Sequence, residues 1–301
     1  MIERETEHTT FLQFDHLSRI PGLRHAVFTR LKGFSTGRFA GLNASFTTGD
    51  DPAVVAQNRA AIIDAVGLPL LGAHPVHGTA VEILEASEIA TARQPAAPWT
   101  AIQQRLRQTD ADAMLTDAHG FAFCWAFGDC APILLFDPVH HALGMVHAGW
   151  HGTAGGIALH AVAAMRDRYG TDAGTLFAGI GPTIQACCYE VDGHVEEAFD
   201  RNGTTSALAV FEKRAPDTGA HGTGLYLDLA RSNFRQLVAA GVRESRIEVA
   251  PFCTGCRTDV FYSHRKEPRP SGRFAVAIGL ADPALIVPPS QDVSRAWNSA
   301  E

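Results

Sequence analysis

Apolar and polar residues follow one another along this chain in short blocks that predict strands and helices. Residues 51–66, DPAVVAQNRAAIIDAV, have the spacing of an amphipathic helix with a proline near its start. Residues 195–201 and 227–241 are also helical in pattern, and the latter ends on Gly241 in a C-cap position. Strands are predicted for segments that include residues 26–46, 76–84, 113–117, 121–127, 132–136, 142–146, 176–182 and 274–280.

Residues 144–156, GMVHAGWHGTAGG, lead from an apolar run into a histidine and a glycine-rich turn. The run predicts a strand ending near His147, and residues 153–168 predict a helix with Thr153 as its N-cap. Ligands of α/β proteins bind at the carboxyl ends of strands, and N–H groups at a helix N-terminus favour anions. The alternative interpretation is a strand–helix turn that needs glycine for its geometry alone.

The ends of the chain have a different character. Residues 1–10 are polar, and residues 282–301 contain prolines without any periodic pattern, so both are expected to be disordered tails. Between them no repeat or linker divides the chain, although residues 86–109 look like an inserted loop or a partly helical excursion. Residues 11–281 are therefore predicted to form a single domain of mixed α/β type.

Composition narrows the class of protein and its partners. The 301 residues are 46% hydrophobic and 19% charged, as in soluble globular proteins. A net charge of −7 argues against nucleic acid or an anionic membrane as the main partner, but not against a small anion in a local positive pocket. The N-terminus lacks the apolar core of a signal peptide, and no segment is apolar for long enough to span a bilayer. We expect a cytoplasmic protein.

Six cysteines are too few for a disulfide framework in a chain of this length. The adjacent Cys187 and Cys188 are predicted to be small buried residues. Cys253 and Cys256 form a CxxC with no second pair to complete a four-thiolate zinc site, so a structural role is predicted for them.

Three residues share a local pattern, because His77, Cys130 and His147 each lie at a predicted strand edge beside glycine or aspartate. Two imidazoles and a thiolate, with a fourth position left to water, form a known type of catalytic zinc site, in which zinc lowers the pKa of the water. Only the fold can bring them together, since they are far apart in sequence. Alternatively, Cys130 is a nucleophile activated by one of the histidines. Asp129 has three candidate roles in these hypotheses: it orients a histidine, it shuttles a proton, or it only caps a turn.

A basic cluster, SHRK, occupies residues 263–266. Arg265 is a candidate for bidentate binding of phosphate, because a guanidinium offers parallel N–H donors to two oxygens. A solvated loop charge is the alternative interpretation.

The chain resembles the YfiH-like family, also called laccase-domain or multicopper polyphenol oxidase-like proteins, from about Ala26 to Leu280. The segments that carry the resemblance, in order, are FTR (28–30), GLN (41–43), GDDPAVVAQNR (49–59), VHG (76–78), ADA (111–113), DCAPILLFDP (129–138), VHAGWHGTAGGI (146–157), IGPTIQACCYEV (180–191), DLARSNFRQL (228–237) and the C-terminal run 253–280.

The resemblance implies a layered α/β/β/α sandwich with mixed sheets. It implies a catalytic zinc held by His77, Cys130 and His147, with copper as the alternative metal, and a small-molecule nucleoside and phosphate as partners. The activities it implies are phosphorolysis of adenosine, inosine and methylthioadenosine, and deamination of adenosine. Gly149 and Gly152 would let the backbone approach a bound ligand, and the helix near Thr153 would offer N–H groups to phosphate. A monomer or a small homo-oligomer is expected.

Two other activities stay open as alternatives. The family's laccase label implies copper-dependent oxidation of phenols, although the chain has no clustered HxH pair. The fold also resembles bacterial cysteine hydrolases, which implies a hydrolase that uses Cys130 on a peptide or cell-wall precursor. A non-enzymatic binding module is not favoured, because a metal site with three protein ligands and a fourth position left to water is typical of enzymes.

The chain departs from the family pattern at several positions. His151 stands where the family usually has Arg or Lys, which makes any phosphate contact there depend on pH. Phe-Gly-Asp precedes Cys130 where Thr-Ala-Asp is usual. His-Pro-Val precedes His77 where Gln-Val is usual, so His74 is a spare candidate ligand. Residues 86–109 are longer than in typical members and are expected to cover or reshape the pocket.

Overall fold

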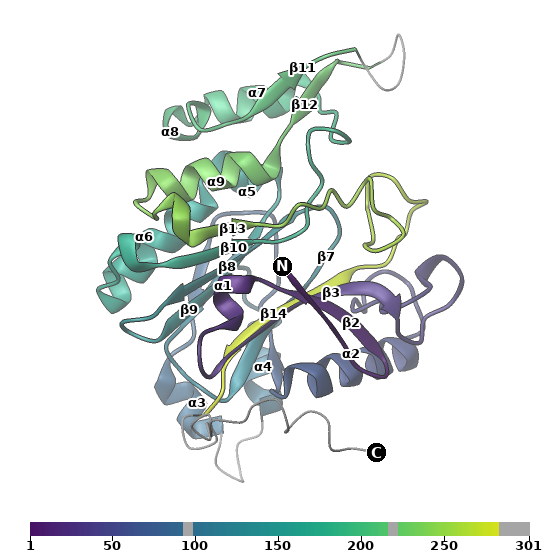
Figure 1. The fold of residues 1–301 in the computed structure, drawn as a ribbon, viewed down its shortest axis with the longest axis vertical. Helices are drawn as coiled ribbons and strands as arrows, with labels where there is room; N and C mark the ends of the chain where they lie inside the picture. The colour runs from purple at the N-terminus through teal and green to yellow at the C-terminus, as the bar shows by residue number, and fades with distance from the viewer. Residues whose placement is uncertain (93–98, 216–221, 283–301) are drawn as a thin grey trace.

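Two six-stranded mixed sheets form the centre of the molecule (Figure 1). The computed structural model describes residues 1–92, 99–215 and 222–282. The first sheet has the order β1 (Ile2–Glu5), β2 (Thr9–Gln13), β3 (Leu23–Lys32), β14 (Phe274–Leu280), β7 (Phe121–Phe127) and β4 (Leu70–Leu71). The second has the order β13 (Ile247–Val249), β10 (Phe177–Ile180), β8 (Ala131–Asp137), β9 (Ala142–Ala148), β6 (Ala113–Thr116) and β5 (Val81–Ile83).

The outer face of the first sheet is covered by α2 (Pro52–Val66), and that of the second sheet by α6 (Ile157–Tyr169) and α9 (Leu229–Ala239). The other helices of the described chain are α1 (Asp15–Ser18), α3 (Ala86–Ala92), α4 (Trp99–Leu106), α5 (Trp150–Gly155), α7 (Gly193–Asp200) and α8 (Gly203–Ser206), with short 3-10 turns at Gly37–Phe39, Ala173–Thr175 and Glu244–Arg246. The strands β11 (Phe211–Lys213) and β12 (Leu225–Leu227) pair antiparallel and form a separate two-stranded ribbon. Among the described residues, no helix is long and apolar enough to cross a bilayer.

Three apolar clusters divide the molecule into four layers. The largest lies between the sheets and contains side chains of both, such as Phe123 and Val276 from the first and Met145 from the second. A second cluster joins the second sheet to α6 and α9, and a third joins the first sheet to α2. The order of layers is thus helix, sheet, sheet, helix, and the predicted α/β/β/α sandwich with mixed sheets is confirmed.

The N-terminal residues differ from the expectation of a disordered tail. Residues 2–5 and 9–13 form β1 and β2, which pair antiparallel and extend the first sheet beyond β3. Thr9, Thr10 and Phe11 are buried there, so this polar-looking segment gains enough packing to be ordered. Of the other predicted tail, residues 283–301 lie outside the described part of the chain.

Two elements near the candidate ligands also differ from prediction. The helix expected over 153–168 is two helices, because α5 begins at Trp150 and the left-handed Gly156 separates it from α6. Thr153 is inside α5 rather than its N-cap, and its N–H and hydroxyl both donate to the Gly149 carbonyl. The strand expected over 76–84 is limited to Val81–Ile83, and the preceding residues form a turn.

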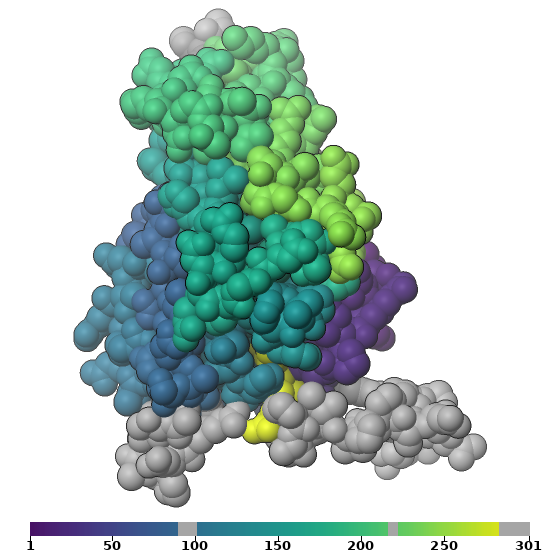
Figure 2. Space-filling model, turned by 90° about the vertical axis from the view of Figure 1, so that its left-hand side faces the viewer, coloured from purple at the N-terminus to yellow at the C-terminus, as the bar shows by residue number. Residues whose placement is uncertain are grey.

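The segment from α7 to β12 forms one end of the molecule, drawn in green at the top of Figures 1 and 2. The helices α3 and α4 lie at the opposite end (Figure 1). Ile89 and Leu106, one from each of these two helices, are buried in the inter-sheet core.

A buried histidine makes the stability of this fold depend on pH. His25 on β3 accepts a hydrogen bond from the backbone N–H of Phe14, and burial, with the nearby His16, lowers its pKa to about 3. Between pH 6.5 and about pH 3, His25 is protonated in the unfolded chain but not in the folded one. The contribution of His25 to the free energy of unfolding is therefore intact above pH 6.5 and is lost as the pH falls.

We predict that unfolding measured in denaturant series between pH 6.5 and pH 4 shows a His25-dependent loss of about 1.4 kcal/mol per pH unit. His25→Gln keeps an acceptor for the Phe14 N–H and removes that part of the slope. His160→Gln, on an exposed part of α6, serves as the control and keeps the slope of the unmodified protein. Equal slopes for the unmodified protein and His25→Gln would contradict the assignment.

Candidate functional site

His77, Cys130 and His147 come together at one edge of the second sheet. Their ligand atoms all lie within 4.8 Å of one another. Cys130 immediately precedes β8 and His147 is near the end of β9, and these neighbouring strands pair Pro132 opposite His147. His77 comes from the turn before β5, and its ring centroid is 4.9 Å from that of His147.

The carboxylate of Asp112 fixes both histidines of this cluster. Its Oδ1 is 2.8 Å from Nδ1 of His147, and the two oxygens also accept the backbone N–H groups of Val76, His77 and Gly78 at 3.2, 2.9 and 2.7 Å. This bonding folds residues 76–78 into a turn and replaces the predicted strand. It also holds His77 at a φ of 62°, a backbone angle that favours glycine.

Asp129 has a different task beside Cys130. Its Oδ1 accepts the hydroxyls of Thr254 at 2.6 Å and Ser263 at 2.8 Å, and its Oδ2 accepts the backbone N–H of Arg265 at 2.6 Å. These contacts agree with the turn-capping interpretation, since they hold the turn before Cys130, where Asp129 itself has a φ of 84°. It is Asp112, and not Asp129, that hydrogen-bonds a histidine of the cluster.

Each charged group of the buried cluster shifts the pKa of its neighbours toward their charged forms. Burial would raise the pKa of the Cys130 thiol, but the charge of His147 and hydrogen bonds to both histidines outweigh burial and lower it. Burial would lower the pKa of His147, yet the charge of Cys130 and the bond to Asp112 raise it. Hydrogen bonds from His147 and Gly78 likewise overcome burial and lower the pKa of Asp112. The site therefore favours a thiolate at Cys130.

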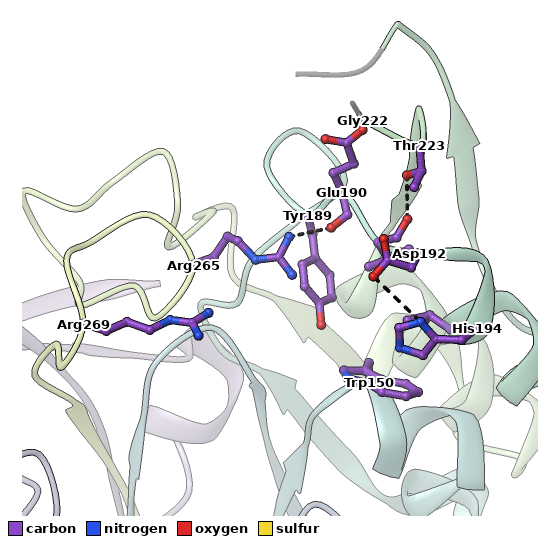
Figure 3. Close-up of a pocket in the computed structure, with 11 residues that line it drawn as sticks. Trp150, Tyr189, Glu190, Asp192, His194, Gly222, Thr223, Arg265 and Arg269 are labelled. Atoms are coloured by element: carbon purple, nitrogen blue, oxygen red, sulfur yellow. Dashed lines mark hydrogen bonds and ion pairs between the residues drawn. The ribbon is translucent and has the colours of Figure 1, made fainter. Parts of the chain in front are cut away.

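A cavity of about 490 Å³ opens beside His77 and Cys130, within the range of pockets that hold small molecules. Its further walls include Trp150, His151, Ile184, Tyr189, His264, Arg265 and Arg269. An adjoining pocket of about 370 Å³ shares Trp150, Tyr189 and the two arginines (Figure 3). His77 and Cys130 of the cluster thus line one end of the cavity, and aromatic, cationic and aliphatic side chains line the rest.

Both arginines come from the loop after β13, and Figure 3 shows them reaching toward Tyr189. The guanidinium of Arg265 donates to the carbonyl of Glu190 at 2.5 Å and lies 4.8 Å from the ring centre of Tyr189. Among the described residues, the guanidinium of Arg269 has no hydrogen-bond or ion-pair partner. The pair gives this wall a local positive charge in a protein of net negative charge.

Gly149 and Gly152, the two glycines predicted to lie at the site, are needed for different structural reasons. A Cβ at Gly149 would lie 3.1 Å from both Sγ of Cys130 and Cδ2 of His77, so glycine lets the backbone run close against the cluster. A Cβ at Gly152 would lie 2.9 Å from the carbonyl oxygen of Gly78, so here glycine lets α5 pack on the turn that carries His77. The close contact of Gly152 is therefore to protein backbone.

His151 stacks on Trp150 with ring centroids 3.5 Å apart, on the wall of the cavity. Burial, with the nearby His77 and His194, lowers its pKa, so it is neutral at pH 7. Helix α5 begins at Trp150, and the N–H of Thr153 donates to the Gly149 carbonyl, so Thr153 itself does not offer its N–H to an anion.

Two other expectations concern residues that lie away from the cavity. His74 is exposed and pairs with Asp110 at 3.1 Å, outside the cluster. The described residues of 86–109 do not line the cavity and so do not cover it. Residues 93–98 lie outside the described part of the chain.

Several residues of the site were not singled out from the sequence. They are Asp112, Trp150, Tyr189 and Arg269. The sequence signals were present but weak: Asp112 lies between two alanines before a strand, and Arg269 is close to the basic cluster 263–266. Nothing in their spacing indicates that they face one cavity.

Comparison with known proteins places the chain among relatives that cover most of its length. It is 34% identical over 254 residues to purine nucleoside phosphorylase YlmD of Geobacillus stearothermophilus, covering 83% of this chain and 88% of that protein. It is 30% identical over 276 residues to a purine nucleoside phosphorylase of Bacteroides thetaiotaomicron, covering 91% and 97%.

Solved structures agree with the fold. The crystal structure of YlmD from Geobacillus stearothermophilus matches with a TM-score of 0.75 at 30% identity, covering 93% of this chain and 98% of that one. The Bacillus licheniformis hypothetical protein YfiH matches with a TM-score of 0.76 at 27% identity, covering 92% and 98%. A family model described as multi-copper polyphenol oxidoreductase laccase matches residues 24–281. The chain therefore belongs to this laccase-domain, YfiH-like family.

Proposed function

We propose that this protein is a zinc-dependent purine nucleoside phosphorylase that accepts adenosine, inosine and methylthioadenosine and also deaminates adenosine. The observation that carries the proposal is the cluster of His77, Cys130 and His147, of which His77 and Cys130 line one end of a cavity that two arginines line elsewhere. The curated relatives, which are named purine nucleoside phosphorylases, support the same class of reaction.

The donor set fits zinc. Two imidazoles and one thiolate are ligands that zinc accepts, and three protein ligands leave a position open for catalysis. Asp112 holds Nδ1 of His147 and so leaves Nε2 to face the cluster, as the carboxylate partners of zinc-bound histidines do. When bound, zinc supplies a positive charge that polarises substrate and lowers the pKa of water.

Arg265 and Arg269 are proposed to bind phosphate. A phosphate dianion entering the cavity meets two guanidiniums, and charge-assisted hydrogen bonds to them orient its oxygens. The contact with Glu190 fixes the position of Arg265, while Arg269 is free of partners in the described chain and can turn toward the anion. His151, which is neutral, adds polarity and no charge at this position.

Trp150 and Tyr189 are proposed to hold the nucleoside. Their rings line the same cavity and offer flat apolar faces on which a purine can stack. Phosphorolysis forms a bond from a phosphate oxygen to the anomeric carbon of the ribose and breaks the carbon–nitrogen bond. The purine leaves with the electron pair and takes up a proton. The residues contribute by holding phosphate and nucleoside in line and by excluding water.

A cysteine hydrolase is the second candidate, because one observation favours it. Cys130, His147 and Asp112 form a chain of contacts in the order of nucleophile, base and orienting carboxylate. Metal content distinguishes the two hypotheses. The phosphorylase hypothesis uses the Cys130 thiolate as a metal ligand, whereas a hydrolase uses the same thiolate as its nucleophile and needs no metal. A copper-dependent phenol oxidase, which the family description suggests, differs in the metal that the purified protein contains.

We expect the purified protein to contain about one zinc at this cluster and to release adenine from adenosine only when phosphate is present. Mass spectrometry of the metal and chromatography of the bases test this. Inosine formed from adenosine would establish the deamination. His77→Ala is expected to lose the metal of this cluster and turnover together, whereas full turnover after complete metal removal would contradict the proposal.

Asp112→Asn is expected to weaken metal binding at the cluster by about 10- to 100-fold, because the amide supports both histidines less well than the carboxylate. Competition with a coloured chelator measures the affinity. Asp110→Asn, two residues away and exposed beside His74, is the matched control and keeps the affinity of the unmodified protein. The assignment fails if the two variants bind metal equally well.

Arg269→Gln is expected to raise the KM for phosphate by about 10-fold or more while the KM for nucleoside changes little, since one charge-assisted hydrogen bond is lost. Steady-state kinetics with phosphate and nucleoside varied in turn separate the two effects. Arg257→Gln, on an exposed arginine paired with Asp259, is the control. Equal rises in both KM values would argue against a specific phosphate contact.

A further inference from the structure

Four cysteines that are not part of the proposed catalytic site converge at a second position. Cys187 and Cys188 lie in the loop after β10, and Cys253 and Cys256 lie in the loop after β13. Their four Sγ atoms are all within 4.8 Å of one another. The expectation that the CxxC lacks a second pair is wrong, because Cys187 and Cys188 provide it, and Cys187 is exposed rather than buried.

The sulfur separations suit a metal better than a disulfide. Sγ of Cys256 is 3.4 Å from Sγ of Cys187 and 3.4 Å from Sγ of Cys188. Tetrahedral zinc with bonds of about 2.3 Å to sulfur sets neighbouring sulfurs about 3.8 Å apart, whereas a disulfide joins two sulfurs at about 2.0 Å. One disulfide would also leave the other two cysteines without a role in the cluster.

The backbone around the cluster is arranged to bring the sulfurs together. The carbonyl of Cys253 accepts the N–H groups of Cys256 and Arg257 at 3.2 and 3.0 Å, which closes the tight turn of the CxxC. The N–H of Gln185 donates to Sγ of Cys253 at 3.4 Å. Backbone N–H bonds to sulfur of this kind support metal-bound thiolates.

Gly255, inside the CxxC, marks the point where the two loops touch. A Cβ there would lie 2.9 Å from Cβ and 3.1 Å from Sγ of Cys188, and 3.2 Å from Cγ of Lys266. Arg214 donates to the carbonyls of Ala186 and Cys187 at 2.9 and 2.8 Å. Two cationic side chains therefore lie near the cluster, where they balance the negative charge of four thiolates around a divalent ion.

The two loops joined by the cysteines also form one wall of the cavity. The first carries Tyr189 and Glu190, and the second carries His264, Arg265 and Arg269. The contact of Arg265 with the carbonyl of Glu190 is a second link between them. A metal ion at the cysteines would fix this wall without touching the substrate.

We propose that Cys187, Cys188, Cys253 and Cys256 bind a structural zinc ion that ties the two loops of the cavity wall together. Four thiolates at tetrahedral spacing select zinc among the common divalent ions, and a closed four-ligand set leaves no open position for catalysis. The site is separate from the cluster of His77, Cys130 and His147 and does not depend on the activity proposed for that cluster.

Metal content in a background without the other cluster gives the most direct test. The double variant His77→Ala/His147→Ala, purified under reducing conditions, is expected to retain about one zinc. Adding Cys256→Ser is expected to remove it. Cys124→Ala, a buried cysteine on β7 outside both clusters, is the control and leaves the zinc in place. Replacing zinc by cobalt should give the intense thiolate-to-metal absorption of a four-sulfur site.

A measurement on the unmodified protein covers the case in which the cysteine variants fail to fold. Bound zinc should protect the exposed Cys187 and Cys256 from alkylation, as read on their own peptides by mass spectrometry. A mercurial thiol reagent should release about two zinc ions per chain, one from each cluster. Rapid alkylation of Cys187 and Cys256 with at most one zinc released per chain, or a disulfide within the cluster in reduced preparations, would overturn the proposal. Zinc bound at the cysteines in a protein without nucleoside turnover would support this site and refute the proposed activity.

Discussion

The buried carboxylate of Asp112 is the interaction on which the candidate site depends. One of its oxygens holds the ring of His147, and the pair of oxygens collects three successive backbone N–H groups around His77. A single charge thus fixes the orientation of one ligand and the backbone of another. Such a carboxylate is tolerated without solvent because every bond it accepts favours its charged form.

Asp129 repeats this arrangement on the other side of Cys130. It ties the turn before the cysteine to the loop that carries Thr254, Ser263 and Arg265. The two aspartates therefore have different roles. Asp112 fixes the position of the two histidines, and Asp129 connects the turn that carries Cys130 to the cationic wall. The four-cysteine cluster brings that wall together with the loop of Tyr189, so residues that do not line the cavity contribute to its shape.

Several of the regular elements could be predicted from the sequence because local chemistry determines them. The helix Pro52–Val66 has Asp51 as its cap and a left-handed Gly67 at its end, and β7, β8 and β14 are continuous apolar runs. Residues 76–78 and the start of α5 could not be predicted, since contacts with distant chain determine their conformation. Asp112 is the clearest case, because its partners lie about 35 positions away and its own neighbours carry no sign of its role.

Anomalous X-ray diffraction can show whether His77, Cys130 and His147 hold a metal that phosphorolysis requires. Crystals of active protein would be soaked with phosphate and a nucleoside and measured at the zinc absorption edge. We predict an anomalous peak between the three side chains, with phosphate against Arg265 and Arg269 and the purine between Trp150 and Tyr189. An active crystal without metal at this position, or one with substrate bonded covalently to Cys130, would contradict it.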